Sequence, residues 1–116
     1  MADPIDGTWI SVVGFDTLAL TVDASLPGSV SGTLSLDGEL LNVIGFTDIH
    51  ATEDSLNLQS LSIATSVNSA GYVSTLTGNL NAIDGRIHFF ELTSRGTSTD
   101  DIWTQTMLVN KIFIKQ

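Results

Sequence analysis

The sequence alternates apolar and polar residues in short segments, and turn residues separate one segment from the next. In the clearest segment, Ser29–Leu36, serine and threonine alternate with valine, glycine and leucine. A period of two is typical of a β-strand that buries one face. The dipeptides Asp37-Gly38 and Asp84-Gly85 are signals for tight hairpins. The chain therefore predicts antiparallel β structure.

Eight segments of this kind follow one another, and no segment shows a persuasive helical pattern. The expected strands are Gly7–Gly14, Asp16–Asp23, Ser29–Leu36, Leu40–Asp48, Ser55–Ser66, Tyr72–Asn81, Arg86–Thr93 and Ile102–Lys115. In the fifth segment the apolar residues change parity between Leu58 and Leu61, which predicts a bulge near Gln59–Ser60.

Eight antiparallel strands joined by short turns predict an up-and-down meander. An open sheet of this size leaves two unpaired edges, and closure into a barrel removes them. We therefore expect an all-β protein, with an eight-stranded antiparallel barrel over residues 1–116 as a single domain, because 116 residues provide too little core for two. Such a barrel has an interior that side chains fill or that holds one small ligand.

Charge and composition exclude several classes of partner. Thirteen acidic residues against four basic ones give a net charge of −9, so we expect no nucleic-acid partner and no anionic membrane partner. No apolar run is long enough for a membrane span. The absence of cysteine excludes disulfides and thiolate chemistry. No signal segment is recognisable at the N-terminus, so we expect either a cytoplasmic protein or one from which a signal was removed.

The histidines do not form a recognisable catalytic or metal-binding pattern. His50 and His88 stand apart in the sequence, and neither has the spacing of a metal-ligand motif. Three acids, Asp48, Glu53 and Asp54, surround His50 and make a weak metal site conceivable, but a solvated loop histidine is the simpler interpretation. We expect a protein that is not an enzyme and has no metal and no cofactor.

A set of short motifs has a characteristic order along the chain. In chain order these motifs are Gly7-Thr8-Trp9, Ser31-Gly32-Thr33, Thr77-Gly78, Arg86-Ile87, Leu92-Thr93-Ser94, Gly96-Thr97, Trp103, Thr106 and Phe113-Ile114-Lys115. Their order and spacing resemble the avidin/streptavidin family, most specifically over Arg86–Lys115. The resemblance implies an eight-stranded barrel that assembles as a dimer or tetramer and binds biotin at one open end.

At most positions that match the family's biotin contacts, this chain carries different chemistry. Family members bind the ureido oxygen through an Asn, a Ser and a Tyr, which match Ser11, Phe15 and Leu34 here. A further Ser matches Leu36, and the Asp or Asn that accepts a ureido N–H matches Lys111. Because each lost polar partner costs about 1–3 kcal/mol, we expect biotin binding to be weak, altered or lost.

The same alignment gives the residues expected to line the site. Three aromatic positions of the family match Thr65, Leu76 and Phe90, whereas Trp103 keeps the Trp that reaches a neighbouring subunit's site. Trp9 and Phe113 match residues at the closed end of the barrel. The expected ligand-binding set is Ser11, Val13, Phe15, Leu34, Leu36, Ser74, Leu76, Phe90, Leu92, Trp103 and Lys111, with its apolar members pointing inward.

Lys111 is the least expected member of this set. It shares strand parity with Val109 and Phe113, so it is expected to point into the barrel, where a charge is costly. Its ammonium either extends out of the open end or anchors the carboxylate of a ligand.

The opposite face of the last strand carries large apolar residues that would point outward. This face consists of Thr104, Thr106, Leu108, Asn110, Ile112 and Ile114. Exposed apolar faces usually mark protein interfaces. We therefore expect a homodimer or homotetramer that packs through the Thr104–Ile114 face, with Trp103 at the same contact.

The sequence thus favours an avidin-like, non-enzymatic barrel for a small molecule, either biotin or another small apolar ligand. Two alternatives stay open. The chain is a genuine biotin binder if the alignment of contacts is wrong. It is a structural or interaction protein, for example lectin-like, if side chains fill the barrel.

Overall fold

All eight expected strands form, and each one pairs antiparallel with its neighbour in the chain. The computed structural model describes residues 5–23, 25–26, 28–36, 38–48, 58–66, 69, 71–81, 83–95 and 106–116. The strands are β1 (Gly7–Ser11), β2 (Thr17–Val22), β3 (Ser29–Leu36), β4 (Glu39–Thr47), β5 (Leu58–Thr65), β6 (Tyr72–Asn81), β7 (Arg86–Arg95) and β8 (Thr106–Lys115). The described residues contain no helix that could cross a membrane.

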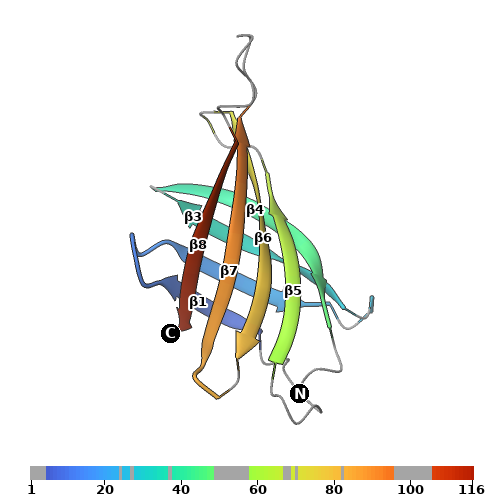
Figure 1. The fold of residues 1–116 in the computed structure, drawn as a ribbon. Helices are drawn as coiled ribbons and strands as arrows, with labels where there is room; N and C mark the ends of the chain where they lie inside the picture. The colour runs from blue at the N-terminus through green and yellow to red at the C-terminus, as the bar shows by residue number, and fades with distance from the viewer. Residues whose placement is uncertain are drawn as a thin grey trace.

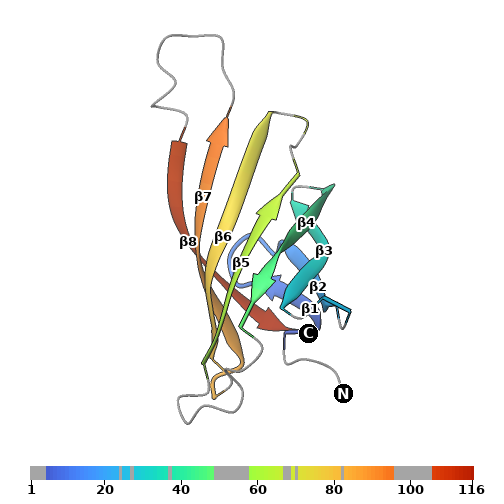
Figure 2. The ribbon, with the colours of Figure 1, turned by 90° about the vertical axis from the view of Figure 1, so that its right-hand side faces the viewer.

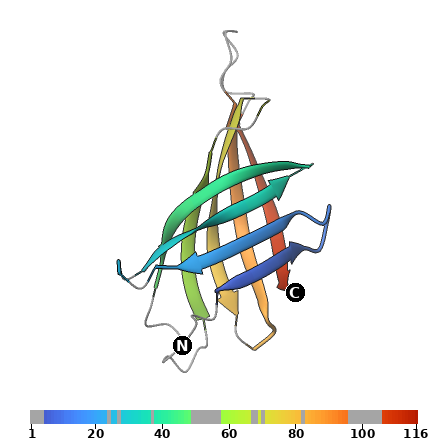
Figure 3. The ribbon, with the colours of Figure 1, turned by 180° about the vertical axis from the view of Figure 1, so that it is seen from behind.

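Pairing between the first and last strands closes the sheet into a barrel. β1 meets β8 in the register Trp9↔Lys115, Ile10↔Ile114 and Ser11↔Phe113. β5 to β8 stand nearly upright in Figure 1, and β1 to β4 cross the barrel at a slope, as the view from behind in Figure 3 shows. β6 to β8 rise above β1 to β3 in Figure 2. We call this the upper end of the barrel, and the end with the C-terminus the lower end.

Large apolar side chains fill the lower interior. Trp9 is buried, and its indole N–H donates to the carbonyl oxygen of Ile5 at 3.0 Å. The rings of Phe89 and Phe113 meet edge to face with 5.8 Å between centroids, an arrangement that aromatic pairs prefer. The core also contains Leu18, Leu20, Val30, Leu34, Val43, Leu61, Ile63, Leu76, Leu80 and Ile87. Trp9 and Phe113 therefore lie in the buried core, as expected for the closed end.

Three inward-facing strand glycines let neighbouring strands approach closely. A Cβ atom on Gly32, Gly45 or Gly78 would lie 1.8–2.0 Å from a backbone carbonyl oxygen of the adjacent strand. No side chain fits at such a distance, so these positions allow the sheet to bend tightly. The bend lets a barrel of this size close around the aromatic rings of the core.

The bulge expected near Gln59–Ser60 does not form, and that prediction is wrong. β5 pairs with β6 without interruption from Leu58↔Asn81 to Ala64↔Thr75. Gln59 points inward and is buried, and its amide donates to the Thr47 hydroxyl at 2.9 Å. The apparent change of parity arises because an apolar residue, Leu58, faces outward while a polar residue faces the core.

Replacing Gly78 with alanine tests the close approach of the strands. We expect Gly78→Ala to lower the free energy of unfolding by about 3 kcal/mol, because β6 and β7 must separate to admit the methyl group. Gly85→Ala is the control, since Gly85 has a φ of +71° but open space around its Cβ position. The control should cost about 1 kcal/mol of backbone strain. Urea unfolding followed by tryptophan fluorescence measures both values, and equal losses would contradict this account.

Candidate functional site

The upper interior carries polar and charged side chains in place of the apolar core. Lys111 on β8 and Glu91 on β7 both point into the barrel, and Asp16 reaches them from the residue just before β2. Ser11, Ser74 and Thr93 share the inward face of their strands with these charges. The interior of the barrel is therefore apolar at the lower end and polar at the upper end.

Lys111 lies between two carboxylates. Its ammonium donates a hydrogen bond to Asp16 at 3.1 Å and forms an ion pair with Glu91 at 3.5 Å. All three side chains are at least four-fifths buried, so solvent screens these charges less than it would at the surface. The sequence leaves two alternatives for the Lys111 ammonium, which either extends into solvent or binds the carboxylate of a ligand. The structure shows a third arrangement, in which Asp16 and Glu91 of the protein supply the anions.

The hydroxyls of the upper interior are bonded to backbone or to one another. The Ser11 hydroxyl is buried and donates to the carbonyl oxygen of Val13 at 2.7 Å. The Ser74 and Thr93 hydroxyls are 2.9 Å apart, and the Thr65 hydroxyl accepts from the Ser74 N–H. Ser11 and Ser74 thus lie inside the barrel as predicted, and Ser74 and Thr93 retain capacity for a further hydrogen bond.

Apolar side chains form the wall and floor below these polar groups. Leu34 and Leu76 are fully buried and point inward, and Leu36 at the end of β3 is half-buried. Leu76 lies directly opposite Glu91 in the β6–β7 ladder. The placement of these three leucines agrees with the inward orientation predicted for them.

Phe90 and Leu92 do not line the interior, and the prediction of their direction is wrong. Both lie on the outer face of β7, with 57% and 47% of their surface exposed. Their neighbours Ile87, Phe89 and Glu91 are the buried residues of the strand. Both parities of β7 carry apolar residues, so alternation alone does not choose between them. The register set by the Asp84-Gly85 turn resolves the ambiguity. It places the inward-facing residues of β6 opposite the inward-facing residues of β7, in the pairs Leu80↔Ile87, Gly78↔Phe89 and Leu76↔Glu91.

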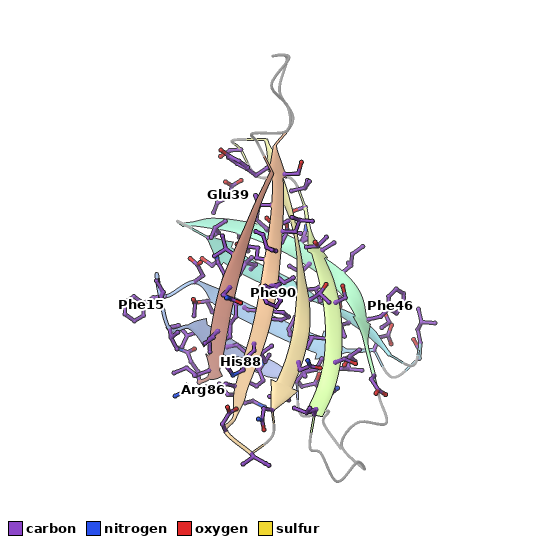
Figure 4. The ribbon with its side chains drawn as sticks, in the orientation of Figure 1. Phe15, Glu39, Phe46, Arg86, His88 and Phe90 are labelled. Carbon is purple, nitrogen blue, oxygen red and sulfur yellow. The ribbon has the colours of Figure 1, made fainter. Side chains whose placement is uncertain are left out.

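Val13 and Phe15 also lie outside the barrel, contrary to prediction. β1 ends at Ser11, and a loop of Val12, Val13, Gly14 and Phe15 leads to Asp16. Phe15 adopts a left-handed backbone conformation with a φ of 58°, and its ring is largely exposed. It points away from the barrel in Figure 4. β1 is therefore shorter than the expected strand Gly7–Gly14, because the turn begins directly after Ser11.

One surface hollow among the described residues touches the charged cluster. A hollow of about 170 Å³ lies where the upper end of β1 meets β8, and Ser11, Val13, Val109 and Lys111 contribute to its lining. A larger hollow of about 490 Å³ lies outside the barrel beside Phe46, with no charged side chain in its lining. A third, of about 290 Å³, lies on the other side of Phe46. Phe46 points away from the barrel in Figure 4.

The remaining predicted positions divide between described and undescribed residues. Trp103 and Thr104 lie outside the described residues, as does His50 with its neighbours Glu53 and Asp54. His88 is on the outer face of β7, where its imidazole is 3.7 Å from the Asp84 carboxylate. In the described part of the chain, no three acidic or histidine side chains gather into a group that could hold a metal ion.

Glu91 and Asp16 are the site residues that the sequence interpretation missed. Glu91 stands two residues after Phe89, and the register set by the Asp84-Gly85 turn places both on the inward face. Asp16 carried no such signal, because its contact with Lys111 spans 95 residues of sequence. Comparison with known proteins adds no further residues: no family model matches the chain, and no curated protein matches it.

Removing the central cation tests the charge arrangement. We expect Lys111→Met to lower the free energy of unfolding by about 3 kcal/mol, because two buried carboxylates lose their shared partner. Lys115→Met is the control, since Lys115 is exposed and its ammonium lies 5.4 Å from the Trp9 ring centre. The control should cost less than about 1 kcal/mol.

The triple variant Asp16→Asn/Glu91→Gln/Lys111→Met should recover most of the loss, because it removes all three charges together. Chemical unfolding at neutral pH measures all three variants. A Lys111→Met protein as stable as the Lys115→Met control would contradict a buried, charge-coupled cluster.

Proposed function

We propose that this protein is a non-enzymatic, avidin-like barrel that binds a small ligand at the upper end of its interior. The observation that carries the proposal is the polarity of that end, where Glu91 and Lys111 face inward above Leu34 and Leu76. Ligand sites typically combine apolar walls with a few convergent polar groups. A barrel needed only as a scaffold gains nothing from charges in its interior, because burying them costs free energy.

The arrangement of the upper end supports weak, altered or lost biotin binding. The Ser11 hydroxyl already donates to a backbone carbonyl, Leu34 has no donor, and Phe15 lies outside the barrel. These are the three positions that match the ureido-oxygen donors of the avidin/streptavidin family. Lys111, at the position of a ureido N–H acceptor, is a donor held by two carboxylates.

Titration calorimetry with biotin tests this part of the proposal. We expect no saturable heat at affinities of about 1 μM or tighter, which corresponds to about −8 kcal/mol. A biotin-binding protein of the avidin/streptavidin family serves as the positive control. Binding of this chain at micromolar affinity or tighter would show that the ureido contacts come from other residues, and the protein would then be a genuine biotin binder.

The outside of the same strands supports assembly with a second copy of the chain. Phe90, Leu92 and Leu108 are exposed, and Leu92 pairs directly with Leu108 across β7 and β8. Ile112 and Ile114 continue this surface toward the lower end. We call Phe90, Leu92, Leu108, Ile112 and Ile114 the β7–β8 outer face. A homodimer or homotetramer buries this apolar face by packing sheet against sheet.

A single charge placed on this face tests the assembly. We expect Leu108→Glu to convert the oligomer into a species of the monomer mass, 12.3 kDa, because a carboxylate in an apolar interface is unpaired. Ile44→Glu is a matched control, since Ile44 on β4 is 67% exposed and Leu108 is 65% exposed. Sedimentation analysis gives the masses. A monomeric parent protein, or equal effects of both variants, would refute an interface at β7–β8.

A further inference from the structure

Glu91 is an acidic residue in a place where carboxylates are rarely found. It lies on β7 between the inward-facing Phe89 and Thr93, and it pairs with Leu76 on one side and Val109 on the other. Only 8% of its side-chain surface is exposed. An ionised carboxylate accepts several hydrogen bonds, and one that is withdrawn from water must find them within the molecule or in a ligand.

The charges of the cluster formed by Asp16, Lys111 and Glu91 do not balance. Lys111 forms an ion pair with Glu91, but its ammonium lies closer to Asp16, at 3.1 Å, than to Glu91, at 3.5 Å. Only the contact with Asp16 is a hydrogen bond. Two carboxylates share the Lys111 ammonium, so the three charges of this cluster sum to −1.

We propose that the interior site takes a small organic cation with N–H donors, such as an amidinium, and that Glu91 accepts its hydrogen bonds. This inference rests on the ligand-binding function proposed above. The proposed ligand is a cation, whereas the sequence analysis considered a ligand carboxylate bound by Lys111. Such a carboxylate would be the third anion around one ammonium. With a bound cation, Asp16, Lys111, Glu91 and the ligand form a row of alternating charge.

The surroundings of Glu91 suit the rest of such a ligand. Val109, directly opposite Glu91 on β8, is 42% exposed and offers an apolar surface to a carbon skeleton. The paired hydroxyls of Ser74 and Thr93 lie two positions further along the same inward face and can accept another N–H. The net charge of −9 also favours the approach of a cation over that of an anion.

Three probes of equal size and different charge test the inference on the full-length protein. Benzamidine is cationic, benzamide is neutral and benzoate is anionic. We expect benzamidine to shift the amide resonances of residues around Glu91 and Leu76 in ¹H–¹⁵N spectra, and the other two probes to bind at least about tenfold more weakly, a difference of about 1.4 kcal/mol.

Variants of the glutamates connect the binding to Glu91. Glu91→Gln should weaken benzamidine binding about tenfold, and Glu91→Asp should keep the preference for the cation because it keeps the carboxylate. Glu39→Gln is the matched control, since the Glu39 carboxylate accepts from the Ser69 N–H and hydroxyl at the β3–β4 hairpin. Spectra and unfolding curves of each variant establish that the fold is kept.

The outcomes separate this inference from the function on which it rests. If benzamide or benzoate shifts the interior resonances and benzamidine does not, the ligand-binding function stands and the inference about charge is wrong. Benzamidine binding that Glu91→Gln leaves unchanged also overturns the role of Glu91. If none of the three probes shifts an interior resonance, both the inference and the proposed ligand site fail.

Discussion

Closure of the sheet by β1 and β8 is the constraint on which the rest of this structure depends. The closing ladder is short, with Trp9, Ile10 and Ser11 opposite Lys115, Ile114 and Phe113. β8 continues upward beside β7 as far as Thr106, well beyond its last partner on β1. Above the ladder, the hydrogen bond from Lys111 to Asp16 joins β8 to the β1–β2 hairpin. The charged cluster therefore holds the seam of the barrel as well as lining its interior.

Much of the fold follows from local signals in the sequence. The alternation in Ser29–Leu36 and the glycines of the Asp37-Gly38 and Asp84-Gly85 turns place strands and hairpins correctly, because strand pairing depends on nearby residues. The prediction of which β7 side chains face inward is wrong, because Phe89 and Phe90 are both apolar and alternation alone fits either face. The register of β7 against β6 resolves that ambiguity. The pairing of Lys111 with Asp16 joins distant parts of the chain and has no local signal.

Polarity is inverted along the upper parts of β7 and β8, and this connects the two parts of the proposed function. Charged residues Glu91 and Lys111 point inward, whereas Phe90, Leu92 and Leu108 point outward. A strand that faces water outside and a core inside has the opposite pattern. The inverted pattern fits a barrel that exposes its interior to a polar ligand and covers its outer face with a second copy of the chain.

The proposed function requires access to the upper interior, and the chain allows a direct measurement of this access because it contains no cysteine. Ser74→Cys places a single thiol on the inward face of β6, and Thr75→Cys places one on the exposed outer face. Labelling of the folded protein with methanethiosulfonate reagents that carry an ammonium or a sulfonate group gives the rates. We expect Ser74→Cys to react in the native state and to favour the ammonium reagent more strongly than Thr75→Cys does. A thiol at position 74 that reacts only after denaturation would contradict the account and indicate a barrel filled by its own side chains.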